Sequence, residues 1–232
     1  MDLARHRQKG LYKLRYQAVL FDLDGTLIDS ADDLVVSVKH ALRHVDARRP
    51  PPDDVILMEI GKPLEVMLGD LGYPNNEATA ADFATNYRDY YAVHFNDHTR
   101  PFPSAREVLA FLREAGAKLA LVTTKHQTQA EATAEGMGLR SFFAYVHGWK
   151  EGRRHKPDPE PVRMALEKLG ARPGEALMVG DSEQDMIAAK AAGVPTCAVT
   201  YGFRPLMLLR ALRPDYMVSR ITDLVHIVVS GS

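Results

Sequence analysis

The sequence predicts an α/β fold, a doubly wound parallel sheet with a helical segment inserted after its first strand. Two observations support this fold class. Short apolar runs without polar alternation recur along the chain, as expected for strands buried on both faces of a parallel sheet. From Pro103 onward these runs alternate with helical patterns, which is typical of an α/β domain.

Five apolar runs are the predicted strands. They cover 18–21, 119–122, 176–179, 196–200 and a weaker 216–218. Ser104 and Glu107 form a candidate capping box for a helix that should stop near Gly116. Two later helices should end near Gly170 and Gly193, because glycine is favoured just after the last helical residue.

Residues 30–98 break this alternation and read as helices only. The helical patterns cover 31–45, 63–71 and about 77–98. We therefore expect a helical insertion at 30–98 in a core made of 16–29 and 99–232. The first fifteen residues carry five basic side chains and one acidic one, so that 1–15 is expected to be a solvated basic extension.

Composition and charge restrict the class of protein. The chain has 232 residues and a formal net charge of −1, so it lacks the general positive field that binds nucleic acids. Its longest apolar runs are too short to cross a membrane, and its start lacks the apolar stretch of a secretory signal. Cys197 is the single cysteine, which excludes an intrachain disulfide. We expect a cytoplasmic protein that binds neither nucleic acids nor membranes.

Polar side chains gather where three predicted strands end. They are Asp22, Asp24, Thr123, Thr124, Asp181 and Asp185. Ligands of doubly wound sheets bind beyond the carboxyl ends of the strands. Carboxylates at one such edge repel one another unless a hard cation binds, and an all-oxygen set suits Mg²⁺. Lys156 and the amides of glycine-containing turns add donors for an anion, so the pattern predicts phosphoryl transfer.

Four motifs, in order, resemble those of the haloacid dehalogenase (HAD) superfamily. They are Asp22-Leu23-Asp24-Gly25-Thr26, Thr123 after its strand, Lys156-Pro157-Asp158-Pro159 and Gly180-Asp181-Ser182-Glu183-Gln184-Asp185. The resemblance runs from about Tyr16 to the end of the chain. It implies a Rossmann-like core, with 30–98 as the family's small helical cap, and an Mg²⁺-dependent phosphatase that forms an aspartyl-phosphate.

The resemblance implies a role for each acidic residue. Asp22 would attack phosphorus and bind Mg²⁺. Asp24 would act as general acid and base, and would bind the metal through its backbone carbonyl. Asp181 would be the third metal ligand, and Asp185 would hold Asp181, a metal-bound water or Lys156.

Phosphate binding and substrate choice follow from the same resemblance. Thr123, the Thr124 amide and Lys156 would hold phosphate oxygens. Stretches such as 60–64 and 121–125 resemble the phosphoglycolate phosphatase branch, although that branch often has asparagine at the position of Thr124. The expected substrate is therefore 2-phosphoglycolate or a similarly small phosphorylated metabolite. Lys62 is the candidate ligand for a substrate carboxylate.

Other functions stay open at this point. A pyrophosphatase, a nucleotidase or a β-phosphoglucomutase-like enzyme could use the same scaffold, and a non-catalytic sensor of phosphorylated ligands is a more distant alternative. Each motif also has an ordinary explanation by itself, since Asp-Gly is common in turns and Asp181 could cap the next helix. The sequence does not indicate an oligomeric state.

Overall fold

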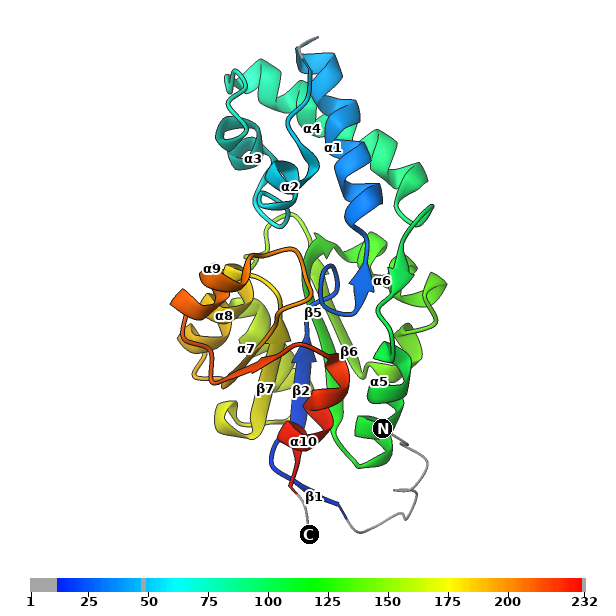
Figure 1. Ribbon diagram of the computed structural model, residues 1–232, viewed down its shortest axis with the longest axis vertical. Helices are drawn as coiled ribbons and strands as arrows, with labels where there is room; N and C mark the ends of the chain where they lie inside the picture. The colour runs from blue at the N-terminus through cyan, green and yellow to red at the C-terminus, as the bar shows by residue number, and fades with distance from the viewer. Residues whose placement is uncertain (1–11, 47–48, 231–232) are drawn as a thin grey trace. The chain divides into compact units, whose positions relative to one another are not determined.

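Figure 1 shows a computed structural model of the chain, which describes residues 12–46 and 49–230. The chain forms two compact units. The core unit runs up to Asp29 and resumes at Pro101, and the helical unit is Ser30–Arg100. The insertion was expected at 30–98. No helix in the described part of the chain is long and apolar enough to cross a membrane.

The core unit is built on a six-stranded parallel sheet. Its order is β6 (Tyr145–Trp149), β5 (Lys118–His126), β2 (Ala18–Phe21), β7 (Ala176–Gly180), β8 (Thr196–Val199) and β9 (Tyr216–Val218). The chain adds β5 and β6 on one side of β2 and then β7, β8 and β9 on the other. In sheets with such a reversal, ligands bind beyond the carboxyl ends of the strands beside it, which here are β2 and its neighbours. The predicted doubly wound fold is confirmed.

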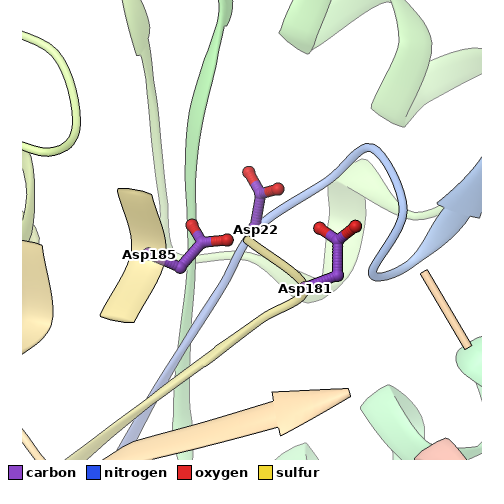
Figure 2. A group of neighbouring side chains, drawn as sticks. All are labelled: Asp22, Asp181 and Asp185. Atoms are coloured by element: carbon purple, nitrogen blue, oxygen red, sulfur yellow. The ribbon is translucent and has the colours of Figure 1, made fainter. Parts of the chain in front are cut away.

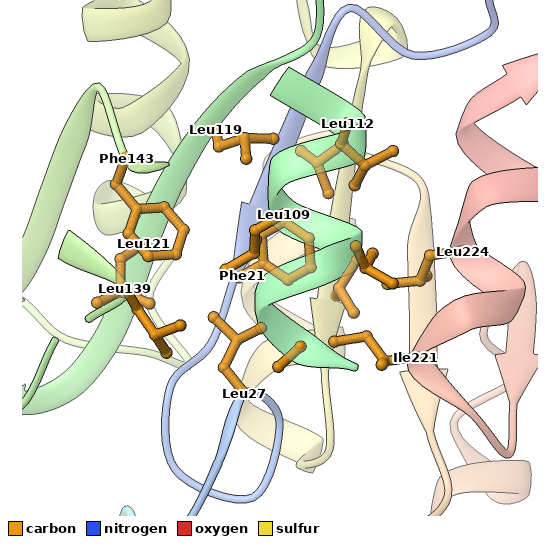
Figure 3. Packing of buried hydrophobic residues seen from close by; sticks show 14 of the residues in the cluster. Phe21, Leu27, Leu109, Leu112, Leu119, Leu121, Leu139, Phe143, Ile221 and Leu224 are labelled. Atoms are coloured by element: carbon orange, nitrogen blue, oxygen red, sulfur yellow. The ribbon is translucent and has the colours of Figure 1, made fainter. Parts of the chain in front are cut away.

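Strand β2 is buried on both faces, as its uninterrupted apolar run predicts. Val19 and Phe21 pack into one apolar cluster and Ala18 and Leu20 into another. The first cluster includes side chains of α5 (Ala105–Glu114), α6 (Gln127–Gly136) and α10 (Leu224–Val228), and part of it is drawn in Figure 3. The second includes side chains of α7 (Glu160–Leu169) and α8 (Glu183–Ala191). The sheet is therefore covered by helices on each face.

Helix ends agree with the sequence in part. Gly170, at φ 61°, follows α7 as expected for a left-handed cap. The predicted capping box at α5 is wrong, because Ser104 adopts a left-handed φ of 65° and makes no side-chain cap hydrogen bond. The helix α8 has a capping box of its own, formed by Ser182 and Asp185.

The helical unit contains four helices in its described residues: α1 (Ala31–Val45), α2 (Asp53–Leu57), α3 (Leu64–Asp70) and α4 (Glu77–His94). The five-residue α2 was not predicted, because it is too short for a periodic pattern. The last helix ends before the expected residue 98. The Asp33 carboxylate accepts hydrogen bonds from the backbone amides of His98 and Thr99, which takes these residues out of a helical pattern.

The remaining elements are short. They are β1 (Lys13–Leu14), β3 (Ile28–Asp29), β4 (Arg100–Pro101), α9 (Leu206–Ala211), β10 (Val229–Ser230) and the 3₁₀ turns 140–142, 173–175 and 221–223. Strand β1 pairs with β10, and β3 pairs with β4 where the chain passes between the units. Most of the predicted extension 1–15 lies outside the described residues, and its described end includes β1.

Candidate active site

Three acidic side chains meet at the carboxyl ends of β2 and β7. Asp22 follows β2, Asp181 follows β7, and Asp185 lies in the first turn of α8. The two strands are paired in register, with Phe21 opposite Val179, so the residues after them are neighbours. Each of the three carboxylates offers an oxygen within 4.8 Å of the others. Figure 2 shows the three neighbouring side chains.

Lys156 holds two of these carboxylates from inside the protein. Its side chain is 2% exposed. The Nζ atom donates to Asp22 Oδ1 at 2.8 Å, to Asp185 Oδ1 at 2.5 Å and to the Val122 carbonyl at 2.7 Å. These three acceptors use the three N–H groups of an ammonium. The structure therefore places the predicted lysine against the predicted nucleophile, far from it in sequence.

Asp185 is fixed from both sides. Its second oxygen, Oδ2, accepts hydrogen bonds from the backbone amide and the hydroxyl of Ser182, at 3.1 and 2.6 Å. The sequence left Asp181, a metal-bound water and Lys156 open as partners of Asp185. In the structure Asp185 contacts Lys156. The alternative explanation of Asp181 as the cap of α8 is wrong, because Ser182 is the N-cap residue.

The environment of Asp22 favours a reactive carboxylate. Burial and the negative charge of Asp185 raise the pKa of Asp22, and the positive charge of Lys156 lowers it. The net result is a pKa raised to about 7. Its Oδ1 is bound to Lys156, whereas Oδ2 has no hydrogen-bond partner among residues 12–46 and 49–230. One oxygen of Asp22 is thus positioned by the protein, and the other is left for a metal or a phosphorus atom.

Asp181 is held by two loops. Its Oδ2 accepts a hydrogen bond from the Phe203 amide at 2.7 Å, and its Oδ1 accepts one from the Thr26 hydroxyl at 3.3 Å. Two glycines make room for it, because a Cβ added at Gly25 or at Gly202 would lie 2.3 Å from an Asp181 atom. Sequence reasoning missed this support.

Burial and crowding indicate how the carboxylates could bind a cation. The pKa of Asp181 is raised to about 8, first by burial and then by the charges of Asp22 and Asp185. A divalent cation would offset this repulsion, and the donor set consists only of oxygens. The residues present therefore fit a hard cation such as Mg²⁺.

Burial and the neighbouring carboxylates shift the pKa of Lys156 in opposite directions. It would lower the pKa of the ammonium, whereas the charges of Asp185 and Asp22 outweigh burial and raise the pKa above its ordinary value. Lys156 therefore stays protonated at neutral pH. A permanent positive charge lies 2.8 Å from the carboxylate predicted to attack.

Asp24 is bound by a lysine that sequence reasoning did not single out. Lys125 Nζ lies 3.0 Å from each carboxylate oxygen of Asp24. The sequence predicted that Thr123 and Thr124 follow the strand. In the structure both lie within β5, which continues to His126. The apolar run stops at Val122 because residues 123–126 are polar, and the pairing of β5 with β6 is irregular over the same stretch. Lys125 could have been found from its position, because it lies two residues after Thr123 and side chains two apart in a strand point to the same face.

The other predicted residues lie as follows. Thr123 is buried, and its hydroxyl accepts a hydrogen bond from the Lys125 amide at 3.2 Å. Thr124 is half-buried. Lys62 lies in the helical unit, where it forms ion pairs with Glu59 at 2.5 Å and Asp70 at 2.7 Å. Its predicted contact with a substrate stays a prediction.

Comparison with known proteins identifies relatives of this chain and its fold. The family model described as Haloacid dehalogenase-like hydrolase matches residues 19–199. A protein of Bacillus velezensis named Pyrophosphatase PpaX is 35% identical over 213 residues, which are 92% of this chain and 96% of the relative. A protein of Neisseria meningitidis named Phosphoglycolate phosphatase is 34% identical over 216 residues, 90% of this chain and 92% of the relative.

Solved structures agree with this result. A protein of Haemophilus somnus described as a predicted phosphoglycolate phosphatase has a TM-score of 0.82 at 27% identity and covers 92% of this chain and 98% of its own. A predicted phosphatase from Clostridium acetobutylicum has a TM-score of 0.82 at 29% identity, over 90% and 96% of the two chains. These findings confirm the prediction of an enzyme of the phosphatase kind. Since the family model matches most of the sequence and both relatives exceed 30% identity over nearly all of it, the chain belongs to the haloacid dehalogenase-like hydrolases.

Proposed function

We propose that the chain is an Mg²⁺-dependent phosphatase that forms an aspartyl-phosphate on Asp22, with 2-phosphoglycolate as the preferred substrate. The observation that carries this proposal is the buried cluster of Asp22, Lys156, Asp181 and Asp185. One carboxylate oxygen of Asp22 is fixed by Lys156 while the other has no hydrogen bond in the described part of the chain. Such a carboxylate is suited to nucleophilic attack.

The proposed reaction has two displacements. Asp22 Oδ2 attacks phosphorus, the bond from phosphorus to the leaving oxygen breaks, and Asp24 gives its proton to that oxygen. Water then attacks the phosphorus of the aspartyl-phosphate while Asp24 takes a proton from the water. This releases inorganic phosphate and restores the Asp22 carboxylate.

The other groups of the site stabilise charge during these steps. The Lys156 ammonium offsets the negative charge that approaches Asp22, and Thr123 with the Thr124 amide would bind phosphoryl oxygens. Asp22, Asp181 and the Asp24 carbonyl would hold Mg²⁺, which when bound supplies Lewis-acid stabilisation of the phosphoryl group. Asp185 would position Lys156 through the 2.5 Å contact.

The relatives favour two substrates. One is named a phosphoglycolate phosphatase and another a pyrophosphatase, at nearly equal identity. Both names describe hydrolysis of a small phosphorylated compound. Pyrophosphate is therefore the second candidate substrate. The expected cytoplasmic location stays a prediction.

A substrate panel with Mg²⁺ tests this proposal. We expect 2-phosphoglycolate to give the highest kcat/KM among 2-phosphoglycolate, pyrophosphate, an aryl phosphate and a sugar phosphate. Asp22→Asn should abolish turnover, by about 10⁴-fold or more, because it removes the nucleophile. The matched control is Asp89→Asn, at an exposed position of α4.

Two outcomes would contradict the proposal. A strong preference for pyrophosphate or sugar phosphates would overturn the choice of 2-phosphoglycolate. Absence of wild-type turnover with every phosphate compound would overturn the phosphatase and favour a sensor of phosphorylated ligands. Trapping of ³²P on wild-type protein but not on Asp22→Asn is the direct check of the covalent step.

A further inference from the structure

Lys125 forms an ion pair with Asp24 in the core unit and has no part in the reaction proposed above. Lys125 Nζ lies 3.0 Å from both carboxylate oxygens of Asp24, and the two side chains are only 4% and 13% exposed. Burying an ammonium is unfavourable unless anions compensate it. A general acid or base does not require a lysine in contact with both of its carboxylate oxygens, so the position of Lys125 calls for another explanation.

The contact with Asp24 places Lys125 relative to the reacting atoms. As general acid, Asp24 must come within about 2.6–3.2 Å of the leaving oxygen. Because Lys125 Nζ is 3.0 Å from the same carboxylate, it lies within about 6 Å of that oxygen. Lys156 contacts Asp22 instead, on the side of the nucleophile. In an in-line displacement Lys156 would then be near the attacking oxygen and Lys125 near the leaving oxygen.

We propose that Lys125 is a specificity-determining residue whose ammonium binds a second anionic group on the leaving part of the substrate. The enzyme would then select phosphate compounds whose leaving group carries a carboxylate or a second phosphate. In 2-phosphoglycolate and in pyrophosphate this second anion is one or two bonds from the leaving oxygen. The four-carbon stem of lysine allows the small shift toward it. This inference rests on the role proposed above for Asp24.

A pair of matched substrates tests the inference. In 2-phosphoglycolamide an uncharged amide replaces the carboxylate of 2-phosphoglycolate, with the phosphate unchanged. We expect Lys125→Met to lower kcat/KM for 2-phosphoglycolate about 10- to 100-fold more than for the amide, because one charge pair is lost only with the acid. Lys125→Arg should retain most of the preference for the acid. Lys168→Met, on the exposed face of α7, is the control.

The alternative is that Lys125 only positions Asp24. The Lys125→Met substitution would then lower kcat/KM equally for the two substrates, and an unchanged ratio of the two values overturns the inference. Circular dichroism checks that Lys125→Met folds; if it does not, Lys125→Gln takes its place.

Binding separates this inference from the proposed function. Calorimetric titration of Asp22→Asn, with and without Lys125→Met, gives Kd for both compounds in the presence of Mg²⁺, whether or not the wild type turns them over. We expect the second substitution to weaken binding of the acid about 10-fold or more relative to the amide. Equal weakening contradicts the role of Lys125. Absence of any turnover by the wild type contradicts only the proposed function.

Discussion

The ion pairs of Lys125 and Lys156 in the core unit are largely buried, whereas those of Lys62 in the helical unit are partly exposed. The Lys156 side chain is 2% exposed and its partner Asp185 is fully buried, whereas Lys62 and Asp70 in the helical unit are 27% and 46% exposed. Removing one partner of a buried pair leaves an uncompensated charge in a medium of low dielectric. When one partner of an exposed pair is removed, water solvates the remaining charge. Loss of one partner is therefore expected to cost more at the buried pair of Lys156 than at the partly exposed pairs of Lys62.

The largest effect is expected for Lys156→Met. It leaves Asp22 and Asp185 close together without a cation, so the free energy of unfolding should fall by about 3–5 kcal/mol. Turnover should fall by about 10³-fold, because charge near the nucleophile is no longer offset. Urea denaturation and steady-state assays measure the two effects, with Lys168→Met as the control. A Lys156→Met protein as stable as that control would show that this ion pair is not important for folding.

An intermediate effect is expected from pH in the absence of divalent cations. The pKa values of Asp22 and Asp181 are raised to about 7 and about 8, above the value of about 4 for an unfolded aspartate. Their folded forms therefore bind more protons. The stability that this provides is complete below about pH 4 and is lost as pH rises through 7 and 8. The slope is at most about 1.4 kcal/mol per pH unit for each proton.

Denaturation in EDTA between pH 5 and pH 9 measures this dependence. Asp181→Asn should flatten the curve, because the variant lacks one of the two groups. Added Mg²⁺ should stabilise the wild type more at pH 8 than at pH 5, since a metal competes with protons for the same oxygens. A wild-type curve that rises with pH across this range would contradict burial as the main influence on Asp22 and Asp181.

The smallest effect on stability is expected for Lys62→Met in the helical unit. Because its ion pairs are partly exposed, the unfolding midpoint should stay close to that of the wild type. The same variant tests the predicted carboxylate contact: KM for 2-phosphoglycolate should rise about 10-fold with little change in KM for an aryl phosphate. Equal KM values in variant and wild type would assign Lys62 to the surface alone.

Local patterns predicted most of the core unit. All five predicted strands are present, because apolar runs of this length are favoured wherever both faces of a parallel sheet are covered. The edge strand β6 was missed because His147 and Gly148 interrupt its apolar run. In the helical unit α2 was missed, and α4 ends early because the Asp33 carboxylate captures the next backbone amides.

The sequence by itself determined that Asp22 and Asp181 follow strands of a parallel sheet, whose carboxyl ends meet at a common edge. With Lys156 in a loop before a helix, these residues follow the pattern of a phosphoryl-transfer site. Only the tertiary structure decided how these charges pair. Lys125 reaches Asp24 across 101 residues, and the Phe203 amide reaches Asp181 through space that Gly202 leaves open. Strand formation depends on neighbours along the chain and is visible in their periodicity. Charge pairing depends on which distant side chains the packed core brings within 3 Å, and no local pattern encodes that.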